Sequence, residues 1–231
     1  MIKAIITDIE GTITRISFVK DILFPYAAKH IAAFVEENQS DATVSAQIDA
    51  VKAEIAKPDA SLTEVIDALQ HWIATDQKIT PLKQLQGLIW QTGYQQGDFT
   101  GHIYPDAYDF LNQQKDAGMS LFVYSSGSVK AQHLLFEHSD YGDIRPLFSD
   151  YFDTHVGGKK DATSYTNILE KIGFASSEVL FLSDILAELD AAKSAGMHTL
   201  QLWRDNQEKS DQHPAIDDFN QFDEALFVWA N

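Results

Sequence analysis

Acidic, hydroxyl and lysine side chains follow the predicted strands of this sequence in a pattern that suits phosphoryl transfer. The run Asp8-Ile9-Glu10-Gly11-Thr12 ends the first apolar segment, Ser125 and Ser126 end a second, and Asp184 ends a later one. A carboxylate can attack phosphorus and form an aspartyl-phosphate, and magnesium prefers carboxylate and water oxygens as ligands. Hydroxyls, helix-start N–H groups and a lysine such as Lys159 can hold phosphoryl oxygens. Because phosphoryl transfer needs mainly positioning and neutralised charge, this set is sufficient for it.

Each of these residues, taken alone, also fits a purely structural role. Asp8 could cap a turn and Asp184 a helix, and Ser125 could cap a helix N-terminus. Lys159 could be a solvated charge on a glycine-rich loop, and Glu188 an exposed helix residue. The order of the whole set and its placement after predicted strands favour the chemical interpretation.

The elements that position these residues are predicted to be alternating strands and helices. Apolar and β-branched runs predict strands at 2–7, 120–124, 151–153, 179–182 and 198–202. Helices are predicted at 105–117, 164–172 and 185–195, each followed by glycine, and 204–218 is predicted as surface loop or terminal linker. This alternation favours a parallel sheet wound with helices, in which ligands bind beyond the carboxyl ends of the strands.

A long helical stretch, from about residue 16 to 101, separates the first predicted strand from the others. Its apolar residues recur every three or four positions, with Pro25 interrupting the first of its helices. Ser61, followed three residues later by Glu64, forms a capping-box pattern. We expect this stretch to be an inserted domain.

Composition and charge narrow the class of function. The chain has 231 residues, 45% of them hydrophobic, and its 34 acidic and 17 basic side chains give a net charge of −17. Such a field repels phosphate backbones and anionic membrane surfaces, so we expect no nucleic-acid and no membrane partner. The absence of cysteine removes thiolate chemistry, and the eight histidines form no zinc-ligand pattern. With no signal-peptide pattern, we expect a cytoplasmic protein.

The chemical residues resemble the four motifs of the haloacid dehalogenase-like hydrolases. The run from Asp8 to Thr12 is similar to the first motif, Asp-x-Asp-Gly-Thr, with glutamate in the second acidic position. Ser125 matches the second motif, Lys159 the third, and Asp184 with Glu188 the fourth. The resemblance implies an α/β fold, with a doubly wound parallel-sheet (Rossmann-like) core of the haloacid dehalogenase type and an inserted helical cap domain. We place the core at 1–15 and 102–231 and the cap at 16–101.

A narrower resemblance is to the acireductone synthases, the bifunctional enolase-phosphatases of methionine salvage. It rests on the glutamate form of the first motif, followed by Ile16-Ser17-Phe18-Val19 and Leu23-Phe24-Pro25-Tyr26. Ile13 and Arg15 depart from the threonine and proline expected there, but they replace no catalytic group.

The resemblance implies a role for each acidic residue of the first and fourth motifs. Asp8 is the nucleophile and a magnesium ligand. Glu10 protonates the leaving oxygen, then activates water, and binds the metal through its backbone carbonyl. Asp184 completes the protein ligands of one Mg²⁺ per chain, and Glu188 orients it.

The remaining motif residues are expected to hold the substrate's phosphate. By the same resemblance, Ser125 and Ser126 bind the phosphate or the carbonyl next to it. Lys159 neutralises the phosphoryl charge and holds Asp8 in place.

The implied substrate is 2,3-diketo-5-methylthiopentyl 1-phosphate, which is enolised and then dephosphorylated. Phe18, Leu23, Phe24 and Tyr26 of the cap are candidates to enclose the apolar methylthio group, or to pack the cap onto itself. His102 is a candidate for proton transfer. We expect a monomer, because the cap closes the site without a partner chain.

Three other functions compete with this interpretation. A general magnesium phosphatase of the same superfamily would act on another small phosphate ester. A haloacid dehalogenase would cleave a carbon–halogen bond without a metal. A receiver domain would keep a long-lived aspartyl-phosphate as a switch, but its aspartate would not follow the first strand ahead of a long helical insertion.

Overall fold

The chain divides into two compact units. The computed structural model describes residues 1–204, 208–223 and 225. One unit, here the core unit, contains Met1–Ile16 and Gly101–Asn231, and the other, here the cap unit, contains Ser17–Thr100. The predicted cap, 16–101, differs from the cap unit by one residue at each end. No helix among the described residues is long and apolar enough to cross a membrane.

The core unit is built on a parallel sheet of six strands in the order β3-β2-β1-β4-β5-β6. The strands are β1 (Ala4–Thr7), β2 (Ser120–Tyr124), β3 (Phe148–Phe152), β4 (Val179–Ser183), β5 (His198–Leu202) and β6 (Ala215–Ile216). The chain runs outward from β1 in one direction and then in the other, so the predicted doubly wound α/β fold is confirmed. A receiver domain has the strand order 2-1-3-4-5, and that alternative is excluded.

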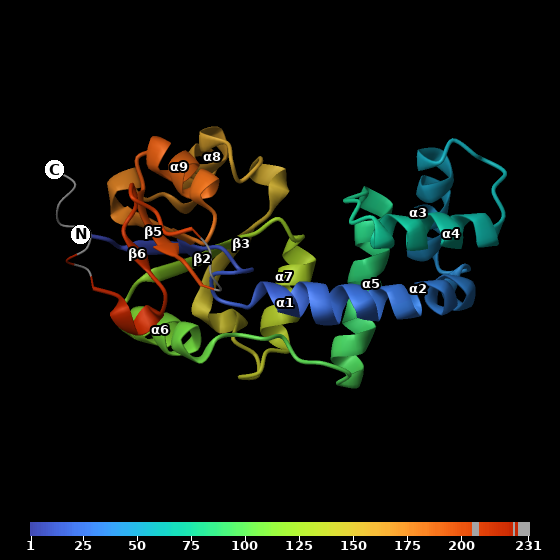
Figure 1. Ribbon diagram of the computed structural model, residues 1–231, viewed down its shortest axis with the longest axis horizontal. Coiled ribbons are helices and arrows are strands. Elements are labelled where there is room, and N and C mark those ends of the chain that lie inside the picture. The colour runs from blue at the N-terminus through green and yellow to red at the C-terminus, as the bar shows by residue number, and fades with distance from the viewer. Residues whose placement is uncertain (205–207, 224, 226–231) are drawn as a thin grey trace. The chain divides into compact units, whose positions relative to one another are not determined.

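Helices cover both faces of this sheet, with α6 on one side and α8 and α9 on the other (Figure 1). The core-unit helices are α6 (Pro105–Asp116), α7 (Val129–Glu137), α8 (Ala162–Ile172) and α9 (Leu186–Ser194), with short 3₁₀ turns η2 (Arg145–Leu147), η3 (Thr154–Val156), η4 (Ser176–Glu178) and η5 (Phe219–Gln221). Alternate strand residues such as Ile6 and Phe181 are fully buried against Tyr165 of α8 and Leu189 of α9. This apolar layer holds the strands in place, and with them the strand ends that carry the chemical residues.

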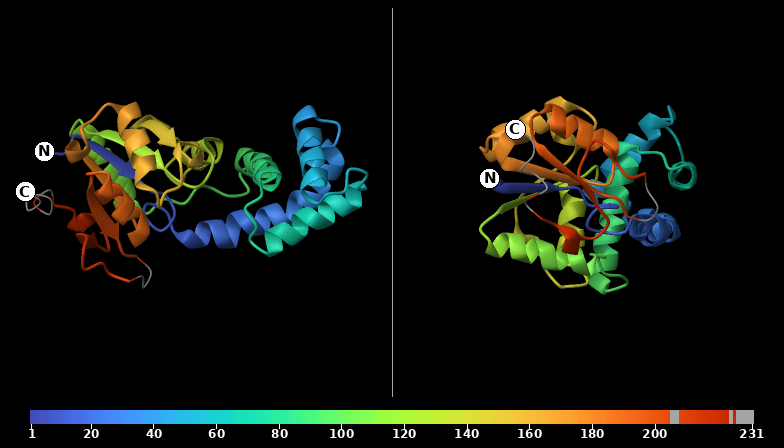
Figure 2. Two further views of the ribbon diagram at one scale, coloured as in Figure 1. Left: turned by 90° about the horizontal axis from the view of Figure 1, so that it is seen from above. Right: turned by 60° about the vertical axis from the view of Figure 1, so that its left-hand side comes forward.

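The cap unit is a group of helices that pack on one another (Figure 2). They are α2 (Phe24–Asn38), α3 (Ala42–Glu54), α4 (Leu62–Ala74) and α5 (Thr80–Gln96), preceded by α1 (Ile16–Phe18) and the π turn η1 (Val19–Leu23). The Ser61 and Glu64 capping box at the start of α4 is confirmed, with both reciprocal hydrogen bonds formed.

Pro25 does not interrupt a helix, contrary to the sequence prediction. It is the second residue of α2, directly after the π turn η1 at 19–23, and the backbone keeps helical angles from one into the other. Phe24 N–H still donates five residues back, to the carbonyl of Val19, so the change from π to α hydrogen bonding falls at the proline. This change accommodates a residue that has no N–H to donate.

The two outer strands were the least well predicted. β3 begins at Phe148, before the predicted 151–153, because exposed Ser149 and Asp150 obscure its apolar pattern. The segment 204–218 is predicted as loop or linker, and its described part beyond 207 is loop except at two residues. There Ala215 and Ile216 form β6 beside β5, and His213 is buried.

Candidate functional site

The parallel sheet brings the predicted site residues to one edge. Asp8 directly follows β1, and its N–H donates to the carbonyl of Leu182 in the neighbouring β4 at 2.9 Å. Asp184 directly follows β4, and Ser125 follows β2 on the other side of β1. The strand order reverses between β1 and β4, and a doubly wound sheet opens its ligand-binding crevice at such a point.

The loop of residues 8–14 is a tight turn that closes on itself. The carbonyl of Ile9 accepts the N–H groups of Ile13 and Thr14 at 3.0 Å, and Gly11 N–H donates to the carbonyl of Thr14 at 2.8 Å. Gly11 has φ +81°, and a Cβ at this position would overlap the carboxylate of Asp184. A glycine is therefore needed for the backbone angle and for the approach of the loop to Asp184.

Lys159 joins two buried carboxylates of the core unit. Its Nζ donates to Asp8 Oδ1 and forms an ion pair with Glu188 Oε2 at 2.7 Å. Glu188 Oε2 also accepts from Ser183 Oγ at 2.9 Å. Asp8, Lys159 and Glu188 are 3%, 7% and 8% exposed. Lys159 is thus a buried cation and Glu188 a buried anion. The alternatives that Lys159 is a solvated charge and Glu188 an exposed helix residue are therefore wrong.

These charges shift one another's pKa values. Burial alone would lower the pKa of Lys159, but the carboxylates of Asp8 and Glu188 outweigh it and hold that pKa above its usual value. Burial raises the pKa of Glu10, and the charge of Asp8 raises it further. The pKa of Glu188 is raised for the same two reasons, in the same order. A raised pKa lets Glu10 carry a proton closer to neutral pH than an ordinary glutamate.

Ser125 lies beside Glu10 and shapes the loop that follows β2. Its Oγ donates to Glu10 Oε2 at 3.2 Å and accepts from the N–H of Gly127 at 3.1 Å. The side chain that caps α7 is that of Ser128, which accepts from Ala131 N–H at 3.3 Å. The capping alternative for Ser125 is therefore excluded, and Ser126 lies exposed in the same loop.

Two buried residues that hold this loop were not among the predicted site residues. Asp153, just after β3, accepts the N–H of Val129 at 3.1 Å, and Gln132 donates from Nε2 to the carbonyls of Gly127 and Phe152, each at 2.9 Å. Asp153 is a strand-end acid like Asp8, so its position in the pattern could have identified it. Gln132 carries no comparable sequence signal.

The oxygen donors at this edge fit a magnesium ion. Asp8 and Asp184 are buried carboxylates, 3% and 4% exposed, and the carbonyl of Glu10 belongs to the loop that Gly11 brings against Asp184. The described residues contain no cluster of three or more His, Asp or Glu side chains able to hold a metal. Magnesium needs no such cage, because it is usually held by one or two carboxylates, water and substrate phosphate.

His102 lies where the chain re-enters the core unit. Its Nδ1 contacts Thr14 Oγ1 at 3.1 Å and accepts the N–H of Arg15 at 3.3 Å. The ring thus links the two segments of the chain that lead to and from the cap unit. This contact is a structural role for the residue proposed from sequence as a proton-transfer candidate.

The apolar cap residues make contacts within the cap unit itself. The ring of Phe24 stacks on Trp90 with centroids 6.4 Å apart. Tyr26 donates to Asp98 at 2.6 Å and lies edge-on to Phe99. Phe18 and Leu23 are 2% and 7% exposed. These contacts account for the residues as packing groups of the cap, and their role around a methylthio group stays a prediction.

Comparisons with known proteins show the family of this chain. The model of the haloacid dehalogenase-like hydrolase family matches residues 2–196. Enolase-phosphatase E1 of Serratia proteamaculans (strain 568) is 52% identical over 228 residues, 99% of this chain and 100% of that protein. Enolase-phosphatase E1 of Sulfurihydrogenibium sp. is 57% identical over 204 residues, 88% of this chain and 89% of that protein.

Solved structures show the same architecture. The UTR4 protein of Saccharomyces cerevisiae has a TM-score of 0.81 at 34% identity, with 96% of this chain and 100% of that chain covered. CbbY of Rhodobacter sphaeroides, solved with phosphate, shares the fold with a TM-score of 0.58 at 17% identity, covering 96% of each chain.

Proposed function

Because this chain belongs to the haloacid dehalogenase-like hydrolases, and within them to the enolase-phosphatases, we propose that Asp8 is the nucleophile of its phosphatase step. The chain is an enolase-phosphatase of methionine salvage, an enzyme that acts on a phosphorylated small molecule. The observation that carries the residue assignment is the setting of Asp8. It is a buried carboxylate beyond the central strand, held by Lys159, with Glu10 two residues further along.

The substrate in this proposal is 2,3-diketo-5-methylthiopentyl 1-phosphate. Enolisation removes a proton from the carbon next to a carbonyl and needs a donor for the enolate oxygen. In this proposal Ser126, exposed in the loop after β2, supplies that donor. The products are the acireductone 1,2-dihydroxy-3-keto-5-methylthiopentene and inorganic phosphate.

The phosphatase step uses Asp8 and Glu10 in turn. A carboxylate oxygen of Asp8 attacks phosphorus, the bond from phosphorus to the substrate oxygen breaks, and that oxygen takes the proton of Glu10. Glu10, now a carboxylate, removes a proton from water, and the resulting hydroxide attacks the aspartyl-phosphate. The phosphorus–Asp8 bond breaks, which releases phosphate and restores both side chains. The raised pKa of Glu10 suits both halves of this cycle.

Lys159 and Ser125 hold the reacting groups. The lysine keeps one oxygen of Asp8 in a hydrogen bond and leaves the other for attack. Its positive charge offsets the negative charge of the incoming phosphoryl group, and its ion pair with Glu188 helps to hold it. Ser125 orients Glu10 through the hydrogen bond between their side chains.

A magnesium ion completes the proposed site. Asp8, Asp184 and the backbone carbonyl of Glu10 would hold it. When bound, the ion supplies positive charge that neutralises the phosphoryl oxygens. We expect chelation with EDTA to stop phosphate release and added Mg²⁺ to restore it, and activity that survives full chelation would contradict the metal assignment.

The decisive experiment follows both products at once. The protein is incubated with the diketo phosphate while enol absorbance and free phosphate are recorded together. We expect the enol signal to precede or accompany phosphate. Phosphate release without an enol-derived product would favour the general phosphatase and contradict the substrate proposed here.

A cytoplasmic monomer belongs to the same proposal. A small phosphate ester is charged and does not cross a membrane, so its enzyme is expected in the compartment where the ester is made. Light scattering after size exclusion should give the mass of one chain, 25.8 kDa.

A further inference from the structure

The nucleophile loop, residues 8–14, is held from outside by a residue far along the chain. Within the loop, the carbonyls of Ile9 and Thr14 accept the loop's own N–H groups. The carbonyl of Thr12 instead accepts a hydrogen bond from Arg204 Nε at 3.1 Å, across 192 residues of sequence. Thr12 is fully buried, and its hydroxyl is also the group that reaches Asp8 Oδ2, at 3.5 Å. One residue of the loop therefore contacts both Arg204 and the nucleophile.

The guanidinium of Arg204 is fixed on several sides. It forms an ion pair with Asp106 of α6, and these side chains are 9% and 10% exposed. It also lies over the ring of Tyr104 at 4.1 Å from the centroid, and the N–H of Tyr104 donates to the carbonyl of Ile13 at 2.9 Å. Arg204 and Tyr104 thus hold two successive carbonyls of the nucleophile loop.

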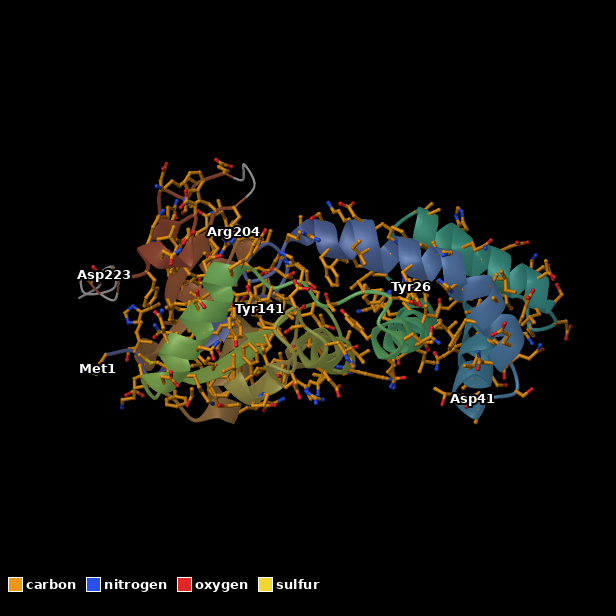
Figure 3. All side chains as sticks on the ribbon, turned by 90° about the horizontal axis from the view of Figure 1, so that it is seen from below. Met1, Tyr26, Asp41, Tyr141, Arg204 and Asp223 are labelled. Carbon is orange, nitrogen blue, oxygen red and sulfur yellow. The ribbon has the colours of Figure 1, made fainter. Side chains whose placement is uncertain are left out.

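The C-terminal segment completes this support. Asp106 Oδ2 accepts the N–H of Phe219 at 2.9 Å, and the Phe219 ring lies 5.5 Å from the Arg204 guanidinium. Figure 3 labels Arg204 on the core unit. A buried, paired and stacked arginine has its orientation determined before substrate binds, which is the condition for positioning another group.

We propose that Arg204 is a positioning residue for the phosphatase step, acting through the carbonyl of Thr12 on the loop that presents Asp8. The inference rests on the proposed role of Asp8 as nucleophile. In-line attack on phosphorus depends on the placement of the carboxylate to within a fraction of an ångström. Loosening the loop should therefore slow the chemical step while substrate binding changes little.

Arg204→Lys is the discriminating variant, because lysine keeps the charge for Asp106 but has neither the Nε donor nor the planar face. We expect kcat for phosphate release to fall about 10- to 100-fold, with KM within about twofold of the wild-type value. Asp106→Asn, which leaves Arg204 in place but removes the negative charge of its ion pair, should also lower kcat. If Arg204→Lys does not fold, Asp106→Asn provides the test of the proposal.

The matched control is Arg145→Lys. Arg145 donates through both Nε and Nη2 to Asp143, so the substitution removes the same kind of fork, but Arg145 lies just before β3, at the amino end of the sheet. We expect wild-type kcat and KM for this variant. An equal loss of kcat in both arginine variants would show a general effect on stability and overturn the proposal.

Hydrogen exchange supplies a readout that does not depend on activity. Arg204→Lys should speed exchange of the Gly11–Thr14 amides, whereas Arg145→Lys should not. Unchanged exchange, or faster exchange with unchanged kcat, would overturn the positioning role. If wild-type protein released no phosphate from the diketo phosphate, the proposed function would fail, and the exchange of these amides would still decide whether Arg204 holds the loop.

Discussion

At the scale of single residues, burial separates chemical groups from surface charges. Among the described residues, the buried carboxylates are Asp8, Asp153, Asp184 and Glu188, and the buried lysine is Lys159. Burying a charge is costly unless it is paired, and Lys159 is paired with both Asp8 and Glu188. Apolar side chains could fill the same space at lower cost, so a buried charged group at a strand edge points to function.

Asp8→Asn should abolish phosphate release. The amide cannot attack phosphorus, and we expect a loss of about 10⁴-fold or more in kcat. Circular dichroism should show an intact fold, because the amide oxygen can still accept from Lys159. Normal phosphate release by the purified variant would refute the aspartyl-phosphate mechanism.

Glu10→Gln should trap the intermediate. Glutamine can neither protonate the leaving oxygen nor activate water, so the aspartyl-phosphate that does form should persist. Rapid acid quench with labelled substrate should recover label on the protein, with more label per chain than in the wild type. Turnover at the wild-type rate, with no increase in bound label, would remove Glu10 from this role.

At the scale of elements, the site depends on one loop and on how closely it approaches its neighbour. The loop after β1 turns at Gly11 so that its backbone lies against Asp184. The loop after β2 is held by Gln132 and Asp153, which come from α7 and the end of β3. Each loop is thus supported by a neighbouring element, as a catalytic arrangement requires.

Gly11→Ala tests that close approach, and Gly118→Ala is its matched control. Both glycines have positive φ, +81° and +86°, but a Cβ at position 118 has nothing within 4 Å. Each substitution should cost about 1–2 kcal/mol from the left-handed backbone. Only Gly11→Ala should also lower kcat, by about 10-fold or more, and weaken activation by Mg²⁺. Equal kinetics in the two variants would show that the Asp184 contact is unimportant.

Ser61→Ala tests the capping box of the cap unit. Losing the Ser61 hydroxyl that accepts from Glu64 N–H should destabilise α4 by about 1 kcal/mol. Thr63→Ala, one residue before Glu64, should be neutral or slightly stabilising, because alanine is the better helix former. Hydrogen exchange of the α4 amides measures both effects. Equal protection in the two variants would show that the Ser61 hydroxyl does not stabilise α4.

At the scale of the whole molecule, a net negative charge is compatible with an anionic substrate, because most acidic side chains are exposed to solvent and the charges of the site are buried. The net charge is −17, yet the described acidic residues other than Asp8, Glu10, Asp153, Asp184 and Glu188 are at least partly exposed. Exposed charges are screened by salt over about 10 Å. Lys159 and a bound magnesium ion would act at much shorter range, so the sign of the net charge does not exclude a phosphate ester.

The stability of the core unit should depend on pH through His102, which contacts Thr14 and Arg15. Burial lowers the pKa of its ring below the ordinary 6.5, and the charge of Arg15 adds to this; Arg204 also lowers it, while Asp140 opposes them. The folded state thus binds fewer protons than the unfolded state, so its stability falls as pH drops through 6.5.

His102→Asn keeps an acceptor near the position of Nδ1 but does not titrate. Between about pH 8 and pH 5.5, the wild type should lose free energy of unfolding relative to this variant. Urea unfolding of both proteins across this range measures the difference. A constant difference would show that His102 does not titrate on unfolding.

Local patterns in the sequence were enough to predict the architecture, and they also identify the residues proposed to react. The β-branched run before Asp8, the glycines after the core helices and the Ser61 capping pattern are each short-range, and strand-end placement follows from the geometry of any parallel sheet. The nucleophile motif likewise lies within five consecutive residues, from Asp8 to Thr12. Such signals depend on neighbours in sequence, so they can be read from sequence alone.

Only the tertiary structure decided how those residues are held. The pairing of Lys159 with Asp8 joins groups 151 residues apart, and the bond from Arg204 to Thr12 spans 192 residues. Nor does any local pattern distinguish a buried Lys159 from a solvated one, or Gln132 from an ordinary helix residue. Burial and long-range hydrogen bonding are properties of the folded chain, because they arise only when distant segments exclude water from the same place.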